Sequence, residues 1–148
     1  MANIRVNAFA DVPLSPEVAY GLIADYRHGH PRILPPRYFS GLVVEAGGVG
    51  AGTRVRFDMH AFGNHQTLHA DITEPEPGRK LVETVVESGA VTTFTVEPLA
   101  GGAQSRVTIR TEYAREGISG WIEALFAPRL LKTIYLEQLE LLSRAGSR

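Results

Sequence analysis

The chain has 148 residues, with 15 basic and 16 acidic side chains and no cysteine. The net charge of −1 gives no electrostatic case for nucleic acid or an anionic membrane surface as a partner, and the lack of cysteine excludes disulfides and thiolate chemistry. No apolar run reaches the roughly 18 residues that a transmembrane helix needs. We therefore expect one cytoplasmic domain over residues 1–148, without integral membrane association, in an oligomeric state that the composition leaves open.

The N-terminal segment predicts a strand followed by a short helix. Apolar residues occupy every second position from 4 to 10, as in a strand with one buried face, and the segment lacks the basic flank and apolar core of a signal peptide. Ser15, Pro16 and Glu17 then supply a hydroxyl cap, a proline for the first turn and an acid near the positive end of the helix dipole. The helix would pack through Ala19, Leu22, Ile23 and Tyr26.

The middle of the chain predicts mainly strands. Residues 27–39 contain one glycine and three prolines, so we expect nothing regular there beyond a short helical turn near residues 32–34. The glycine-rich residues 47–53 lack the lysine and the following helix of a phosphate-binding loop, which favours a turn. Six strand-like runs, separated by turn residues, fill residues 41–115: 42–46, 53–62, 65–73, 80–87, 91–98 and 106–113.

The central hairpin can be interpreted at the level of side chains. If Gly63 and Asn64 form a type II′ turn, with glycine first, Phe62 pairs with His65. The polar face then carries two opposite-charge pairs, Asp58 with His69 and Arg56 with Asp71. The other face carries an apolar row: Val55, Phe57, Met59 and Ala61 against Leu68, Ala70 and Ile72. This pattern predicts an antiparallel sheet with one solvated and one buried face.

The last thirty residues predict one dominant helix, over residues 117–145. Pro128 disfavours an unbroken hydrogen-bond ladder, so we expect a kink or a one-turn break at residues 124–128. The apolar residues before the break are Ile118, Trp121, Ile122, Leu125 and Phe126. Those after it lie on a different arc: Leu130, Leu131, Ile134, Tyr135, Leu139, Leu141 and Leu142. The predicted helix is therefore bent and needs a large apolar surface to lie on.

The order of these elements resembles that of a known family. The relevant stretches are SPEVAYGLIADY after the first strand, the turn and strand GGVGAGTRVRF, the run FTVEPL, the strand RVTIRTEY, and a final helix interrupted by proline. They are similar to the polyketide cyclase/dehydrase and lipid-transport family of the START-like superfamily, which includes the birch-pollen-allergen-like proteins. The resemblance implies an α+β helix-grip fold: a curved seven-stranded antiparallel sheet wrapped around a long C-terminal helix, with two short helices between strands 1 and 2.

The resemblance also implies a hydrophobic cavity between the sheet and the final helix. Gln138 is the one polar residue near the centre of the apolar arc after Pro128, and it fits either a ligand contact or a core amide with partners. Glu83 points into the cavity if Leu81 and Val85 do, but the opposite alternation fits equally well. The candidate ligand-binding residues are Tyr26, Phe57, Met59, Leu68, Glu83, Phe94, Tyr113, Leu131, Ile134, Tyr135 and Gln138.

Five histidines raise the question of a metal or a catalytic base. The hairpin places His60, His65 and His69 on or near the polar outer face, without an accompanying metal-binding motif, so we predict no metal site. The resemblance places His28 and His30 at one end of the cavity, where we favour a loop role over a ligand or general-base role. The candidate catalytic residues are His28, His30 and Glu83.

Three functions follow as hypotheses. The first is binding or transport of a hydrophobic or amphipathic small molecule, such as a lipid, in the cavity. The second is an enzyme of the polyketide cyclase, aromatase or dehydratase type that uses polar groups in the same cavity. The third is a protein-interaction module. We expect no cofactor in any of them, and the sequence identifies no particular ligand.

Overall fold

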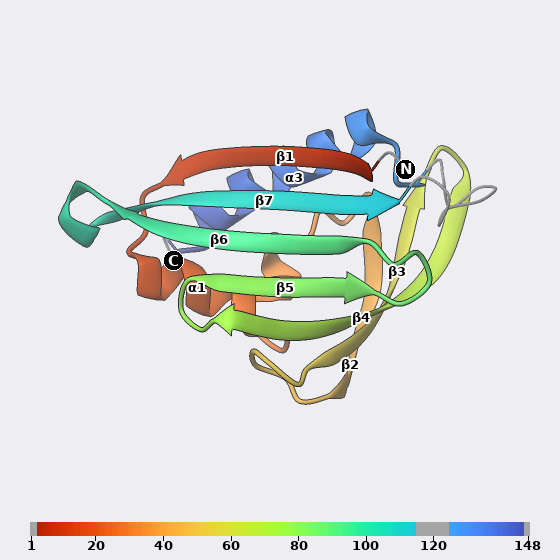
Figure 1. Cartoon of the computed structure of the whole chain (residues 1–148), viewed down its shortest axis with the longest axis horizontal. Coiled ribbons are helices and arrows are strands. Elements are labelled where there is room, and N and C mark those ends of the chain that lie inside the picture. The colour runs from red at the N-terminus through yellow and green to blue at the C-terminus, as the bar shows by residue number, and fades with distance from the viewer. Residues whose placement is uncertain (1–2, 115–124, 147–148) are drawn as a thin grey trace.

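The computed structural model describes residues 3–114 and 125–146, which form a curved antiparallel sheet and a long C-terminal helix (Figure 1). The seven strands have the order β1-β7-β6-β5-β4-β3-β2. The helix α3 (Pro128–Ala145) packs along β1. The strands are β1 (Asn3–Val12), β2 (Phe39–Ala46), β3 (Arg54–Ala61), β4 (Asn64–Glu76), β5 (Lys80–Val85), β6 (Val91–Leu99) and β7 (Gln104–Ala114). This is the helix-grip fold that the resemblance implied.

Two short helices connect β1 to β2, as predicted. The helix α1 (Pro16–Ala24) begins where Ser15 Oγ accepts a hydrogen bond from the Val18 N–H. The 3₁₀ helix η1 (His30–Ile33) follows in the proline-rich segment. The end of α1 is fixed to the glycine-rich turn, because the Tyr26 N–H donates to the Gly48 carbonyl at 2.8 Å. The predicted turn of residues 47–53 therefore serves to hold α1 against the sheet.

The final helix begins at Pro128, after the predicted interruption. Ala127 has an extended backbone, with φ of −58° and ψ of 133°, and the Leu131 N–H donates to the Ala127 carbonyl. Proline is well suited to the first helical position, because the N–H that it lacks has no partner within the helix. The earlier part of the expected helix, residues 117–124 with Ile118, Trp121 and Ile122, lies outside the described residues.

The apolar core lies between the inner face of the sheet and α3. Its members come from alternate positions on the strands and from one side of the helix, as the sequence periodicity predicts. The largest of them that are at most 1% exposed include Leu68, Leu81, Phe94, Ile109, Ile134, Leu139 and Leu142.

The hairpin between β3 and β4 turns one residue earlier than expected. Ala61 pairs with Asn64, so the turn residues are Phe62 and Gly63. Their φ angles of 54° and 77° correspond to a type I′ turn and not to type II′. The sequence-based expectation put glycine first because glycine adopts positive φ without steric cost, whereas phenylalanine in this region is strained.

The earlier turn shifts the register of β3 and β4 by two residues. The expected pairs of Asp58 with His69 and of Arg56 with Asp71 are therefore wrong. A shift of two residues keeps every side chain on its predicted face, because side chains alternate with a period of two. The observed outer-face pairs are Arg54 with Asp71, Arg56 with His69, and Asp58 with Thr67.

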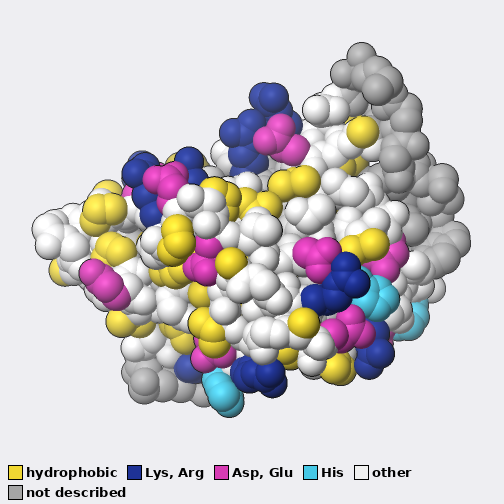
Figure 2. Space-filling model, turned by 60° about the horizontal axis from the view of Figure 1, so that its bottom comes forward, with side chains coloured by type: hydrophobic (Ala, Val, Ile, Leu, Met, Phe, Trp, Pro, Cys, Tyr) yellow, Lys and Arg dark blue, Asp and Glu magenta, His cyan; other side chains and the backbone are white. Residues whose placement is uncertain are grey.

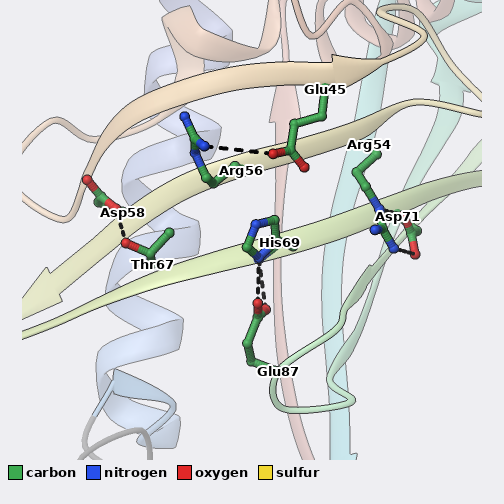
Figure 3. Close-up of polar contacts among 8 residues, drawn as sticks. All are labelled: Glu45, Arg54, Arg56, Asp58, Thr67, His69, Asp71 and Glu87. Carbon is green, nitrogen blue, oxygen red and sulfur yellow. Dashed lines mark hydrogen bonds and ion pairs between the residues drawn. The ribbon is translucent and has the colours of Figure 1, made fainter.

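Polar side chains cover the outer face of β2, β3 and β4 (Figure 3). Arg54 donates through Nε and Nη2 to the two carboxylate oxygens of Asp71, at 2.6 and 2.8 Å, and these hydrogen bonds lower the pKa of Asp71. His69 Nδ1 lies 2.6 Å from Glu87 Oε2. Figure 2 shows the same mixing of basic and acidic side chains over the face that it presents. Such exposed pairs contribute little stability, and they mark this face as the solvated one.

Replacing Phe62 by asparagine is expected to raise the free energy of unfolding by up to about 1 kcal/mol. Asparagine tolerates positive φ, and the Phe62 side chain is 78% exposed, so little buried surface is lost. Urea denaturation measures the change. Phe62→Ala is the control, since alanine retains the strain and should bring no gain. Equal stabilisation by both variants would show that backbone strain is not the cause.

The two edges of the sheet are β1 and β2. The ladder between β2 and β3 is irregular at two places, between Ser40 and Val43 and between Val44 and Ala46. Gly41, within the first irregularity, has a φ of 64°. Such irregularities bend a strand and change the face to which its side chains point.

Candidate functional site

A cavity of about 60 Å³ lies between the inner face of the sheet, η1 and α3. Most of its wall is apolar: Leu34, Phe39, Leu42, Val55, Phe57, Met59, Leu68, Val85, Phe94, Phe126 and Leu131. The polar residues of the wall are Tyr26, His30, Glu83, Thr92, Tyr135 and Gln138. The cavity therefore combines an apolar lining with a few polar groups, the usual composition of a small-molecule site.

Most of the sequence-predicted ligand residues lie in this wall. They are Tyr26, Phe57, Met59, Leu68, Glu83, Phe94, Leu131, Tyr135 and Gln138. Tyr113 and Ile134 lie outside it. The Tyr113 hydroxyl donates to the Phe126 carbonyl, just before α3, and Ile134 is completely buried in the core. Both residues therefore hold α3 on the sheet and do not line the cavity.

The wall also contains residues that the sequence reasoning missed. Val55 has the same parity as Phe57 and Met59 on β3, so strand alternation alone could have found it. Phe39 and Leu42 are three positions apart and would face opposite ways in a regular strand. Both line the cavity because the β2 ladder is irregular between Ser40 and Val43. The other missed residues are Leu34, Val85, Thr92 and Phe126.

The pairing of β5 resolves the orientation of Glu83. Leu81 and Val85 are buried, at 0% and 7% exposure, so the residue between them on the same face also points inward. Glu83 lies opposite Ile72 on β4 and Thr92 on β6. The carboxylate consequently reaches the cavity from the centre of the sheet.

Glu83 forms a buried cluster with Tyr26 and His30. The Tyr26 hydroxyl donates to Glu83 Oε2, and His30 Nε2 lies 3.4 Å from the same oxygen. The Tyr26 and His30 rings stack with their centroids 4.2 Å apart, and Phe94 meets the imidazole edge-on at 5.7 Å. Burial and the charge of Glu83 raise the pKa of Tyr26 well above its usual value, so this hydroxyl stays neutral and can donate.

The contacts of His30 define where its hydrogens lie. Its Nδ1 is 2.8 Å from the Ile23 carbonyl oxygen, which can only accept, so Nδ1 carries a hydrogen. Its Nε2 faces Glu83 Oε2 at 3.4 Å. Among the described residues, Glu83 Oε1 receives no hydrogen bond. One carboxylate oxygen is thus held by Tyr26 and His30, while the other is available to a bound molecule.

A second polar group in the wall is a chain of hydroxyls. The Tyr135 hydroxyl is hydrogen-bonded to Thr111 Oγ1, and Thr111 Oγ1 lies 2.7 Å from Thr92 Oγ1. Burial raises the pKa of Tyr135 to about 12. Tyr135 and Thr92 both line the cavity, so the chain offers neutral hydroxyl groups to its interior.

Tyr135→Phe is expected to reduce the slope with which the free energy of unfolding falls between pH 10 and pH 12. Tyr135 has a pKa of about 12 in the folded protein against a usual 10.0, so its contribution is complete below pH 10 and is lost as the pH rises to 12. The slope for one such group is at most roughly 1.4 kcal/mol per pH unit. Urea denaturation across this range measures it, with Tyr38→Phe, a half-buried tyrosine, as the control. An unchanged slope in Tyr135→Phe would contradict the assignment.

Gln138 adds an amide to the wall from α3. The residue is 4% exposed, and its side chain forms no hydrogen bond to another of the described residues. No side-chain nitrogen or oxygen of these residues is both fully buried and without a partner. The amide atoms of Gln138 therefore keep some accessible surface, and the residue lines the cavity. A polar group of a bound molecule could form hydrogen bonds with this amide.

A larger open groove adjoins the cavity. It has a volume of about 1040 Å³ and runs between the proline-rich segment, β2 and Leu141 of α3. The two spaces share four lining residues, Tyr26, Leu34, Phe39 and Leu42. These four residues form the boundary through which a molecule would pass from the groove to the cavity.

The structure separates the two histidines to which the sequence assigned a loop role. The side chain of His28 is 84% exposed and lies 3.7 Å from Asp25, whereas His30 is buried in the cavity wall.

No cluster of three potential metal ligands occurs in the described part of the chain. In the same part, no helix is long and apolar enough to cross a bilayer.

A curved antiparallel sheet closed by a C-terminal helix over a partly polar cavity defines the helix-grip class of proteins. A family model described as polyketide cyclase/dehydrase and lipid transport matches residues 3–145. The chain belongs to this family. No curated protein matches the sequence.

Solved structures support the same fold. The NMR structure of the KanY protein (ms6282) aligns with a TM-score of 0.84 and 26% identity, with both chains covered completely. A START superfamily protein from Mycobacterium smegmatis aligns with a TM-score of 0.75 and 13% identity, covering 97% of each chain. The Zhui aromatase/cyclase from Streptomyces sp. R1128 aligns with a TM-score of 0.71 and 15% identity, covering 99% of this chain and 95% of that one.

Proposed function

We propose that this protein binds a small amphipathic molecule between the sheet and α3. The observation that carries the proposal is Gln138, which lines a mainly apolar cavity and forms no side-chain hydrogen bond to another of the described residues. A ligand oxygen or N–H would supply the missing hydrogen bond, while its apolar part would contact the surrounding side chains. The family described as polyketide cyclase/dehydrase and lipid transport supports the same class of ligand.

The size of the cavity restricts how a ligand can be bound. At about 60 Å³ it is smaller than the roughly 300–1,000 Å³ typical of ligand pockets. The adjoining groove is much larger and is separated from the cavity only by shared side chains. We therefore propose that a ligand places one end in the cavity and extends into the groove.

The test fills the cavity and leaves the surface unchanged. Val85 lines the cavity, whereas its neighbour Val86 lies in the turn after β5, outside the cavity wall, and is 53% exposed. Val85→Phe is expected to weaken binding of the neutral apolar dye phenylnaphthylamine by at least about tenfold, and Val86→Phe is the matched control. Native mass spectrometry and solvent extraction of the purified protein would identify a ligand that copurifies. Failure of the wild-type protein to bind any apolar molecule would exclude the proposal.

A second candidate function is supported by the Tyr26–His30–Glu83 cluster. A general base needs a titratable group that reaches the proton to be removed, held in position by neighbouring groups. Glu83 Oε1 meets this description, because Tyr26 and His30 hold the other oxygen of the same carboxylate. We propose that Glu83 could take a proton from the carbon next to a ligand carbonyl. The electron pair of the broken C–H bond would move onto the carbonyl oxygen, to which the Gln138 amide could donate a hydrogen bond.

This enzymatic function has a test that does not require the final product to be known. Polyketide mimics with a proton next to a carbonyl are incubated with the protein in deuterated water. Base catalysis predicts protein-dependent exchange of that proton for deuterium, observed by NMR. Dye binding without any exchange would leave the protein as a binding protein only.

A further inference from the structure

We infer that the ligand carries a negatively charged group, and that this group lies in the outer groove beside Arg27 and Arg32. The inference rests on the proposed binding function and extends it by naming the charge and the orientation of the ligand. Both arginines line the groove outside the cavity, and both are exposed to solvent.

The two guanidinium groups are held by neutral backbone carbonyls. Arg27 Nη2 donates to the Gly47 carbonyl at 2.8 Å, and Arg32 Nη2 donates to the Ala145 carbonyl at 2.7 Å. Within residues 3–114 and 125–146, neither arginine forms an ion pair with a carboxylate. Most other arginines of these residues do form one: Arg5, Arg37, Arg54, Arg56, Arg106, Arg110 and Arg144.

The position of Arg27 is built into the glycine-rich turn. Its side chain lies directly on Gly48, where an added Cβ would come within 2.4 Å of Nε. Gly48 has a φ of 151°, and its carbonyl also accepts the hydrogen bond from the Tyr26 N–H. The turn therefore fixes one guanidinium at the rim of the groove and one cavity residue at the same time. A preorganised guanidinium loses less conformational entropy when it binds an anion.

The nearby acidic groups do not cancel this charge. Asp25 is the closest carboxylate along the chain, and its Oδ1 accepts the backbone N–H groups of Arg27 and His28. These hydrogen bonds lower the pKa of Asp25 in spite of partial burial, so it contributes one negative charge. Among the described residues, no carboxylate lines the groove itself. The two guanidinium groups are therefore near one carboxylate, which backbone N–H groups already occupy.

The charge distribution determines the orientation of the ligand. Leu34, Phe39 and Leu42 separate the basic rim from the cavity, so an apolar body would pass between them while the anionic group stayed outside. Guanidinium groups bind carboxylate, sulfonate and phosphate oxygens through paired N–H donors. The inferred ligand class is therefore an amphipathic anion with one such group at the end of an apolar body.

Two dyes with the same aromatic body test the inference. Anilinonaphthalene sulfonate carries an anionic group, and phenylnaphthylamine is its neutral counterpart. The wild-type protein is expected to bind the sulfonate dye at least about tenfold more tightly. The double variant Arg27→Gln with Arg32→Gln should lose this preference and retain its affinity for the neutral dye. Arg79→Gln, at an exposed arginine in the turn between β4 and β5, is the matched control.

A second double variant guards against a purely structural effect. Arg27→Lys with Arg32→Lys keeps both positive charges and is expected to retain most of the preference for the sulfonate dye. Inorganic phosphate, which has no apolar body, is expected to leave the bound dye in place. Three results would overturn the inference. The wild-type protein could bind both dyes with equal affinity, or the glutamine variant could lose affinity for both dyes equally. The third such result is displacement of the bound dye by phosphate. Binding of neither dye would instead count against the proposed function itself, so the two failures are distinguishable.

Discussion

Replacing Ile134 by alanine is expected to lower the free energy of unfolding by about 2–5 kcal/mol. Ile134 is completely buried in the middle of α3, and the variant would lose its apolar contacts and leave a void where the surrounding side chains cannot fully close. Because the helix covers the sheet, the loss should also shift the thermal midpoint by several degrees. Urea denaturation followed by circular dichroism measures the change.

Leu136 provides the matched control on the same helix. It lies two residues further along α3 and is 47% exposed, so Leu136→Ala should change the free energy of unfolding by no more than about 0.5 kcal/mol. Similar losses for the two variants would mean that the inner side of α3 is not what holds the helix on the sheet. That result would contradict the described packing of α3 against the sheet, and not only the expected size of the loss in stability.

Replacing Glu83 by glutamine is expected to slow deuterium exchange of a bound carbonyl compound by about 10²–10⁴-fold. The glutamine amide cannot take up the proton, but its oxygen can still accept the Tyr26 hydroxyl, so the cluster keeps its shape. Binding of phenylnaphthylamine should therefore stay within about twofold of the wild-type value. Exchange is measured by NMR and binding by fluorescence, on the same preparation.

Glu87→Gln is the control for this substitution. Glu87 follows β5 and contacts His69 on the outer face, away from the cavity (Figure 3). The same change of charge at Glu87 should leave exchange unaltered. If exchange persists at the wild-type rate in Glu83→Gln, the carboxylate is not the base, while the binding proposal stands unchanged.

The periodic parts of the fold could be predicted from the sequence. The sequence predicts Val55 and Met59 on the buried face of β3, and both are buried, although the predicted register is wrong by two residues. Side chains alternate between the two faces of a strand, so a shift of two residues leaves each of them on the same face. Likewise, the break before Pro128 follows from the missing N–H of that residue alone. Both features depend on information that is local in the sequence: a repeating pattern of apolar residues, or a single proline.

The polar part of the site could not be predicted in the same way. Each of the two faces of β5 carries apolar residues, so the sequence does not decide which face is buried. Only the pairing of the strand with its neighbours shows that Glu83 points inward. His30 lies in a proline-rich segment without periodicity, and its partner comes from a distant strand. Phe39 and Leu42 share the cavity only because the ladder of β2 is irregular. Each of these facts depends on a contact between segments that are far apart in the sequence.

The irregular ladder of β2 also affects how copies of the protein can associate. β2 is an outermost strand, and its spacing is interrupted twice within a few residues. A neighbouring molecule that approached this side could not align a long uninterrupted row of backbone donors and acceptors with it. The same distortion that admits Leu42 to the interior thereby disfavours extension of the sheet from one molecule to the next, which is the first step of ordered aggregation.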